Sequence, residues 1–131
     1  MTIYTVADML MHNAVRPVST GAIEVNEDAS GYTVKMVAPG IAPEQFELTL
    51  TGRTLTIKGE ATSEEHKQDE RRHVREFAVG AVARRIEFPL AVDSDGITAQ
   101  STHGILTVRV PKSPSAQPKR IAVNAPAQIS E

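Results

Sequence analysis

Apolar and polar residues alternate with a period of two along most of this chain from residue 22 onward. Because successive side chains of a β-strand point to opposite faces, such alternation predicts strands with one apolar face. Gly, Pro and Asp separate the alternating runs, as they do at the turns between antiparallel strands. The predicted strands are residues 23–26, 32–37, 46–51, 54–58, 77–79, 82–88, 97–101 and 105–110. Together they predict an all-β protein, an antiparallel β-sandwich.

The first 21 residues do not follow this alternation. Val6, Met9 and Leu10 recur at helical spacing, and the spacing predicts a short helix from Thr5 to Ala14. A helix of about three turns is marginal alone and needs a surface to lie on. We therefore expect residues 1–21 to form an N-terminal arm, either docked on its own subunit or buried inside an oligomer.

Residues 60–76 read EATSEEHKQDERRHVRE and contain almost nothing apolar. A hairpin needs only a few residues, and connections this long are usually functional or disordered. Two interpretations stay open from the residues alone. The segment is either a solvated loop or an arm that pairs outside its own subunit.

The chain after Val110 contains three prolines within eight residues, which predicts a stiff, extended linker. Beyond it, Ile121 and Val123 flank Ala122 in a β-like triplet. Two apolar residues on an extended tether can be buried only by docking at a distance, on this subunit or another. The predicted organisation is thus an arm (1–21), a sandwich domain (22–112) and a C-terminal extension (113–131).

Composition narrows the functional classes. Of the 131 residues, 40% are hydrophobic and 23% charged, as in a soluble globular protein, and the formal net charge is −2. That charge disfavours non-specific binding to nucleic acid or to an anionic membrane. Without Cys there is no disulfide and no zinc–thiolate site, and residues 1–11 lack the basic start of a signal peptide. We expect a cytoplasmic protein.

Catalytic chemistry has little support in the sequence. The four histidines are scattered at positions 12, 66, 73 and 103, and neither a phosphate-binding glycine motif nor a nucleophile elbow occurs. His66 has acidic neighbours, but a solvated loop explains them better than a metal site. We therefore expect no enzyme activity, no catalytic or cofactor-binding residue, and no bound metal.

One stretch resembles a known family. Residues 99–106, AQSTHGIL, followed by TVRVPK, are similar to the signature of small heat-shock proteins, the α-crystallin family. Gly104 would supply the positive φ of the last hairpin. Four other segments resemble family segments and follow one another in the family's order. They are APGI at 38–41, LTIKGE at 55–60 before the charged segment, residues 80–89 with Arg84, and the Ile121–Val123 triplet. Phe77 and His103 depart from the family pattern.

The resemblance implies an immunoglobulin-like sandwich, the α-crystallin domain, that forms a homodimer by strand exchange and assembles into larger homo-oligomers. In this arrangement the charged segment becomes a swap loop, whose short strand at 69–73 pairs with the partner's strand around Ile23 to Val25. By parity Arg84 shares the apolar face of Val82 and Ile86, where its guanidinium either reaches solvent or is paired. The resemblance implies the second, an interface ion pair, for which Glu64, Glu65, Asp69 and Glu70 are open choices. The expected dimer interface is Ile23, Val25, Asp69, Glu70, Arg71, Arg72, His73 and Arg84.

The resemblance also assigns roles to the two ends of the chain. Ile121 and Val123 are expected to anchor the tail in a groove lined by Leu48, Leu50, Ile97 and Ala99. The expected client-binding arm residues are Ile3, Tyr4, Val6, Met9, Leu10 and Met11.

The implied function is that of an ATP-independent chaperone, a holdase that binds partly unfolded proteins under stress. The alternative is a co-chaperone or interaction module of the p23 type. Such a module needs neither the long loop nor the Ile121–Val123 anchor. A carbohydrate-binding sandwich is a third option, and with 4% aromatic residues the chain has few rings to stack on sugars.

Overall fold

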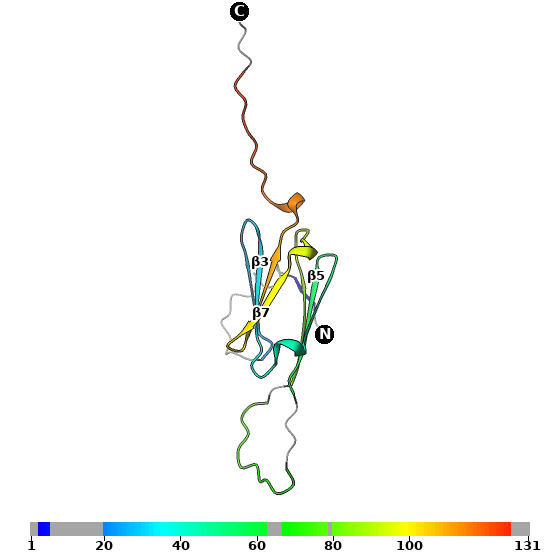
Figure 1. The fold of residues 1–131 in the computed structure, drawn as a ribbon, viewed down its shortest axis with the longest axis vertical. Helices are drawn as coiled ribbons and strands as arrows, with labels where there is room; N and C mark the ends of the chain where they lie inside the picture. Colours follow the sequence, from blue (N-terminus) through cyan, green and yellow to red (C-terminus); the bar gives the residue numbers. More distant parts are fainter. Residues whose placement is uncertain (1–2, 6–19, 63–66, 79, 127–131) are drawn as a thin grey trace, which may run out of the picture.

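A computed structural model of the chain describes residues 3–5, 20–62, 67–78 and 80–126. Eight strands form two four-stranded sheets that pack face to face, in the orders β1-β6-β5-β4 and β2-β3-β8-β7. The long loop leaves one end of the sandwich and the C-terminal tail leaves the other (Figure 1). The strands are β1 (Ile3–Thr5), β2 (Ile23–Glu27), β3 (Gly31–Val37), β4 (Phe46–Thr51), β5 (Thr54–Glu60), β6 (Ala81–Glu87), β7 (Thr98–Thr102) and β8 (Ile105–Pro111). Three short 3-10 turns, η1 (Pro43–Gln45), η2 (Ser94–Gly96) and η3 (Pro114–Ala116), complete the described elements.

The all-β sandwich predicted from the alternation is confirmed. Strand register explains how the alternation builds the core, because residues directly opposite each other on antiparallel strands share a face. Val34 lies opposite Val108 and Leu55 opposite Ile86, and all four side chains are almost completely buried. The core is mostly aliphatic, with one aromatic pair, Tyr32 and Phe88, whose ring centroids lie 4.6 Å apart.

The last hairpin turns at His103 and Gly104, which both have positive φ (53° and 77°). Two consecutive residues in this region form the tight turn that matches the twist of antiparallel strands. Gly104 also accepts a hydrogen bond from the backbone N–H of Ala38 at 2.8 Å. The positive φ expected of Gly104 is therefore confirmed, and His103 adopts the same region despite its side chain.

Two sequence predictions of local structure differ from the fold. The strand predicted at 77–79 is wrong for residues 77 and 78, which have no ladder partner, and Phe77 is 81% exposed. Of the predicted helix from Thr5 to Ala14, only Thr5 is described, and it ends strand β1 rather than starting a helix. Residues 6–14 lie outside the described part of the chain. Strand β1 pairs in parallel with β6, so the start of the arm covers the edge of that sheet.

Candidate functional site

Strand β4 is the outer strand of one sheet and β7 the outer strand of the other. On β4, Leu48 lies opposite Ile57 and Leu50 opposite Leu55. The two partners on β5 are at most 1% exposed, so both leucines face the inside of the sandwich. Yet Leu48 and Leu50 are only partly buried, because no strand lies beyond β4 in that sheet. The interior is thus open along this edge.

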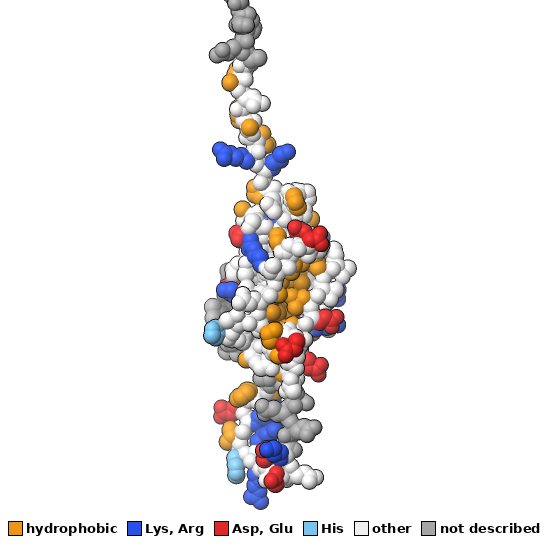
Figure 2. All heavy atoms as spheres, in the orientation of Figure 1, with side chains coloured by type: hydrophobic (Ala, Val, Ile, Leu, Met, Phe, Trp, Pro, Cys, Tyr) orange, Lys and Arg blue, Asp and Glu red, His pale blue; other side chains and the backbone are white. Residues whose placement is uncertain are grey.

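Strand β7 forms the opposite wall of the opening. Ala99 lies opposite the fully buried Val108, so its side chain also faces inward, yet Ala99 is exposed. Ile97, just before β7, packs partly against the core. A stripe of hydrophobic side chains runs between β7 and the β4–β5 hairpin (Figure 2). The four residues predicted to line a groove therefore lie along one open edge of the sandwich, which we call the β4–β7 groove.

The predicted tail anchor is fully accessible. Ile121 is 80% exposed and Val123 is 95% exposed, on an extended segment that points away from the sandwich (Figure 1). An apolar side chain held in water forgoes about 1.5–3 kcal/mol of burial free energy. Neither the groove nor the anchor is covered by described residues of its own chain. Their mutual binding stays a prediction.

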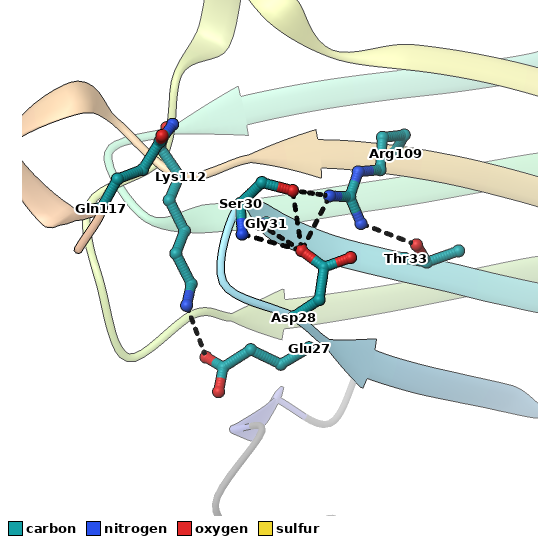
Figure 3. Close-up of polar contacts among 8 residues, drawn as sticks. All are labelled: Glu27, Asp28, Ser30, Gly31, Thr33, Arg109, Lys112 and Gln117. Atoms are coloured by element: carbon teal, nitrogen blue, oxygen red, sulfur yellow. Dashed lines mark hydrogen bonds and ion pairs between the residues drawn. The ribbon is translucent and has the colours of Figure 1, made fainter. Parts of the chain in front are cut away.

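The tail begins at a buried residue, Lys112, whose contacts the sequence did not indicate. Lys112 follows β8 and is only 7% exposed, with its Nζ 3.7 Å from Glu27 Oε1 and 5.6 Å from the centre of the Tyr32 ring. Its backbone N–H donates to Ser30 O, and its carbonyl accepts a hydrogen bond from Gln117 Nε2 at 2.9 Å. Glu27, Lys112 and Gln117 lie in line from β2 to the tail (Figure 3). This contact set fixes the point at which the tail leaves the sandwich.

A second polar cluster secures the adjacent β2–β3 turn (Figure 3). Asp28 Oδ1 accepts hydrogen bonds from the N–H and Oγ of Ser30, both at 2.8 Å, and from the N–H of Gly31. Arg109 on β8 donates to the same oxygen at 3.0 Å and to Thr33 Oγ1. The Arg109 guanidinium, with the Ser30 donors, holds the pKa of Asp28 well below its usual range. The Asp-x-Ser-Gly spacing indicates a turn, but nothing in the sequence links it to Arg109.

Arg84 lies on β6 opposite Ile57, so it faces the sandwich interior as its parity predicts. It is half-buried, and its Nε donates a hydrogen bond to the carbonyl of Gly21 at 2.7 Å. This bond joins β6 to the residues that lead into β2. Of the four carboxylates considered as its ion-pair partner, Glu64 and Glu65 lie outside the described residues, and Asp69 and Glu70 are exposed on the loop. An interface ion pair of Arg84 stays a prediction.

The described part of the charged loop, residues 67–78, is exposed throughout. Its hydrogen-bonded turn runs from Lys67 to Glu70. The segment predicted to form an exchanged strand, Asp69 to His73 with Arg71 and Arg72, pairs with no described strand of its own chain. Its exchange with a partner stays a prediction.

The predicted acceptor of that strand is an outer strand. Strand β2 lies at the edge of its sheet, so one side of its backbone is free of any described strand. Ile23 and Val25 pack partly against their own core. Their side chains are therefore part of the core packing, and their place in a dimer interface stays a prediction.

The predicted client-binding arm is described only at Ile3 and Tyr4, which belong to β1. Val6, Met9, Leu10 and Met11 lie outside the described residues. In the part of the chain that the structure describes, no helix has the length and hydropathy needed to span a membrane. Nor do the described residues contain a group of three or more His, Asp or Glu side chains that could hold a metal ion.

Comparisons with known proteins agree with this geometry. The model of the Hsp20/alpha crystallin family matches residues 24–124. Spore protein SP21 of Stigmatella aurantiaca is 36% identical over 107 residues, covering 82% of this chain and 63% of that protein. The chain thus spans slightly less than two thirds of this relative's length.

Solved structures give the same result. Heat shock protein 16.0 from Schizosaccharomyces pombe superposes with a TM-score of 0.68 at 29% identity, covering 82% of this chain and all of that one. A small heat-shock protein from Xylella fastidiosa gives a TM-score of 0.64 at 33% identity, covering 79% and 95% of the two chains. The match to the family model covers well over half of the residues. The chain therefore belongs to the Hsp20/alpha crystallin family, the small heat-shock proteins.

Proposed function

We propose that this chain is an ATP-independent chaperone of the holdase type, which binds partly unfolded proteins and prevents their aggregation. Its family is one of chaperones rather than enzymes. The observation that carries the proposal is that one chain has both an open apolar groove and an apolar anchor exposed on an extended tail. A monomeric co-chaperone sandwich needs neither feature. The proposed compartment is the cytoplasm, which suits a chain without Cys.

The proposed assembly has two steps. In the first, the loop strand at 69–73 pairs with β2 of a second copy, which satisfies two free backbone edges at once. The basic residues Arg71 and Arg72 would meet an acidic strand, because β2 carries Glu24 and Glu27. Pairing by exchange makes the dimer the stable unit, and Arg84 supports the start of β2 through Gly21.

In the second step, Ile121 and Val123 of one chain occupy the β4–β7 groove of another. Burying the two side chains contributes about 3–6 kcal/mol gross, from which the entropy of ordering the tail is subtracted. Each contact is therefore weak and exchangeable, while many copies together hold a large assembly. Dissociation on warming would release the N-terminal arm, whose methionines suit contacts with many different clients.

Light scattering of a heat-labile client protein tests this function. We expect the purified chain to suppress the scattering at a stoichiometric excess, equally with and without ATP. An equal mass of serum albumin serves as the control for crowding and surface adsorption. If a molar excess of the chain leaves client aggregation unchanged under both conditions, the proposal is wrong.

A further inference from the structure

The residues just before the tail anchor are basic. Lys119 and Arg120 directly precede Ile121, and both are exposed on the extended segment. Residues 113–126 contain no acidic residue, so the described tail carries two positive charges and no negative one. The basic side chains project sideways from the tail (Figure 2). The anchor is therefore a basic and aliphatic peptide, not only an aliphatic one.

Carboxylates lie at one end of the β4–β7 groove. Asp93 caps the turn η2 and Asp95 lies within it, four and two residues before Ile97, the first residue of the groove wall. Asp93 accepts the N–H of Asp95 at 3.1 Å, while Asp95 is exposed. The ion pairs found among the described residues are Arg53–Glu87, Arg109–Asp28 and Lys112–Glu27. Neither carboxylate of η2 takes part in them.

The opposite end of the groove is electrostatically different. There Glu47 precedes Leu48 on β4, but the register puts it directly opposite Lys58 on β5. Opposite charges facing each other across two strands attract and partly cancel. Acidic side chains appear near both ends of the hydrophobic stripe in Figure 2. At the η2 end, Asp93 and Asp95 take part in none of the ion pairs among the described residues, and Arg53 of the β4–β5 hairpin is already paired with Glu87.

Spacing decides how a tail would lie in the groove. Ile121 and Val123 are two residues apart, as are Leu48 and Leu50 on one wall and Ile97 and Ala99 on the other. Two residues of extended chain span about 6.6 Å, so the anchor and both walls share one repeat. The turn η2 and the β4–β5 hairpin lie at the same end of the sandwich (Figure 1). Leu50 is near the end of β4 and Ile97 directly follows η2, so both belong to that end. A tail with Ile121 at that end brings Arg120 to η2.

We propose that the β4–β7 groove selects the tail of a second copy by charge as well as by shape, with Lys119 and Arg120 against Asp93 and Asp95. The tail then runs parallel to β7 and antiparallel to β4, with Val123 near Ala99. This inference rests on the proposed docking of the tail and adds its direction and its specificity. A peptide with Ile-x-Val but without the preceding basic pair binds more weakly.

Peptide binding to the full-length chain tests the inference. The host carries Ile121→Ala and Val123→Ala, so that its own tail does not compete. The probes are a labelled peptide of residues 117–126 and the same peptide with Lys119→Gln and Arg120→Gln, followed by fluorescence anisotropy. We expect the neutral peptide to bind about two- to tenfold more weakly at low salt. The difference should disappear near 0.5 M NaCl, where surface charges are screened.

Two further host variants show which end of the groove causes the preference for the basic peptide. Adding Asp93→Asn and Asp95→Asn should abolish the preference for the basic peptide, and Asn keeps the capping role of Asp93. Glu44 lies in η1, just before β4 and near Glu47. Adding Glu44→Gln and Glu47→Gln at this other end should leave the preference intact. If both peptides bind the first host equally at low salt, or if only the Glu variants lose the preference, the inference is wrong. If neither peptide binds at all, the docking of the tail itself is wrong.

Discussion

Replacing Ile121 and Val123 by Ala should separate assembly from folding. The two side chains are 80% and 95% exposed in the single chain, so their truncation removes almost no packing from the sandwich. In the groove the same side chains would each contribute about 1.5–3 kcal/mol. Ordering three tail residues costs about 3 kcal/mol or more, which leaves a small net gain per tail. Truncation to Ala therefore removes the whole gain at every docking site.

Size-exclusion chromatography with multi-angle light scattering measures the outcome. We expect the double variant to elute as a dimer with no larger species, and its thermal unfolding to match the wild type. The matched control exchanges the two side chains, Ile121→Val with Val123→Ile, and keeps the apolar surface nearly constant. This control should retain the larger species. If the double Ala variant shows an unchanged mass distribution, the tail does not hold the assembly, and the reasoning from the open groove fails.

Three further predictions concern the loop, the β2–β3 turn and the buried Lys112 at the start of the tail. Deletion of Gln68–His73 should give monomers with an unchanged circular dichroism spectrum, and a dimer that survives the deletion would place the interface elsewhere. Asp28→Asn should destabilise the chain at pH 7, because Arg109 and the turn favour the carboxylate form of Asp28 and lower its pKa. That stability is fully present above the unfolded pKa of about 3.9 and is lost as pH falls from there through the lower folded pKa, so the difference between the urea midpoints of wild type and variant should shrink steadily below about pH 3.9; a constant difference would contradict this. Lys112→Ala should lower the free energy of unfolding by about 2 kcal/mol through its buried methylenes, and Glu27→Gln by less than about 1 kcal/mol because Glu27 is half exposed; equal urea midpoint shifts for the two would show that the charge pair, not the packing, matters.

The strands were predictable because burial on one face enforces the period of two. Tyr32, Val34 and Met36 are all fully buried, as the alternation requires. Arg84 was predictable for the same reason, since its parity with Val82 and Ile86 puts it on the inner face. The prediction fails where apolar residues have no ladder partner. Phe77 and Ala78 are both apolar but lie in an exposed segment, because a strand also needs a neighbour for its backbone.

Other features depend on contacts that no local pattern records. Strand β1 has three residues, too few to show a period, and it forms because β6 offers a free edge. The burial of Lys112 requires Glu27 and Tyr32, which lie some eighty residues earlier in the chain. Such contacts follow from the topology of the sheets. The groove residues were predicted from family resemblance, and the register adds the physical reason for their position.

Native mass spectrometry of the purified chain across a temperature series tests the central claim most directly. The account predicts a dimer together with larger species made of even numbers of chains. On warming, the larger species should decline and the dimer should grow at their expense. A chain that is monomeric at every temperature, or a series containing odd numbers of chains in equal abundance, would contradict an assembly built from exchanged dimers joined by their tails.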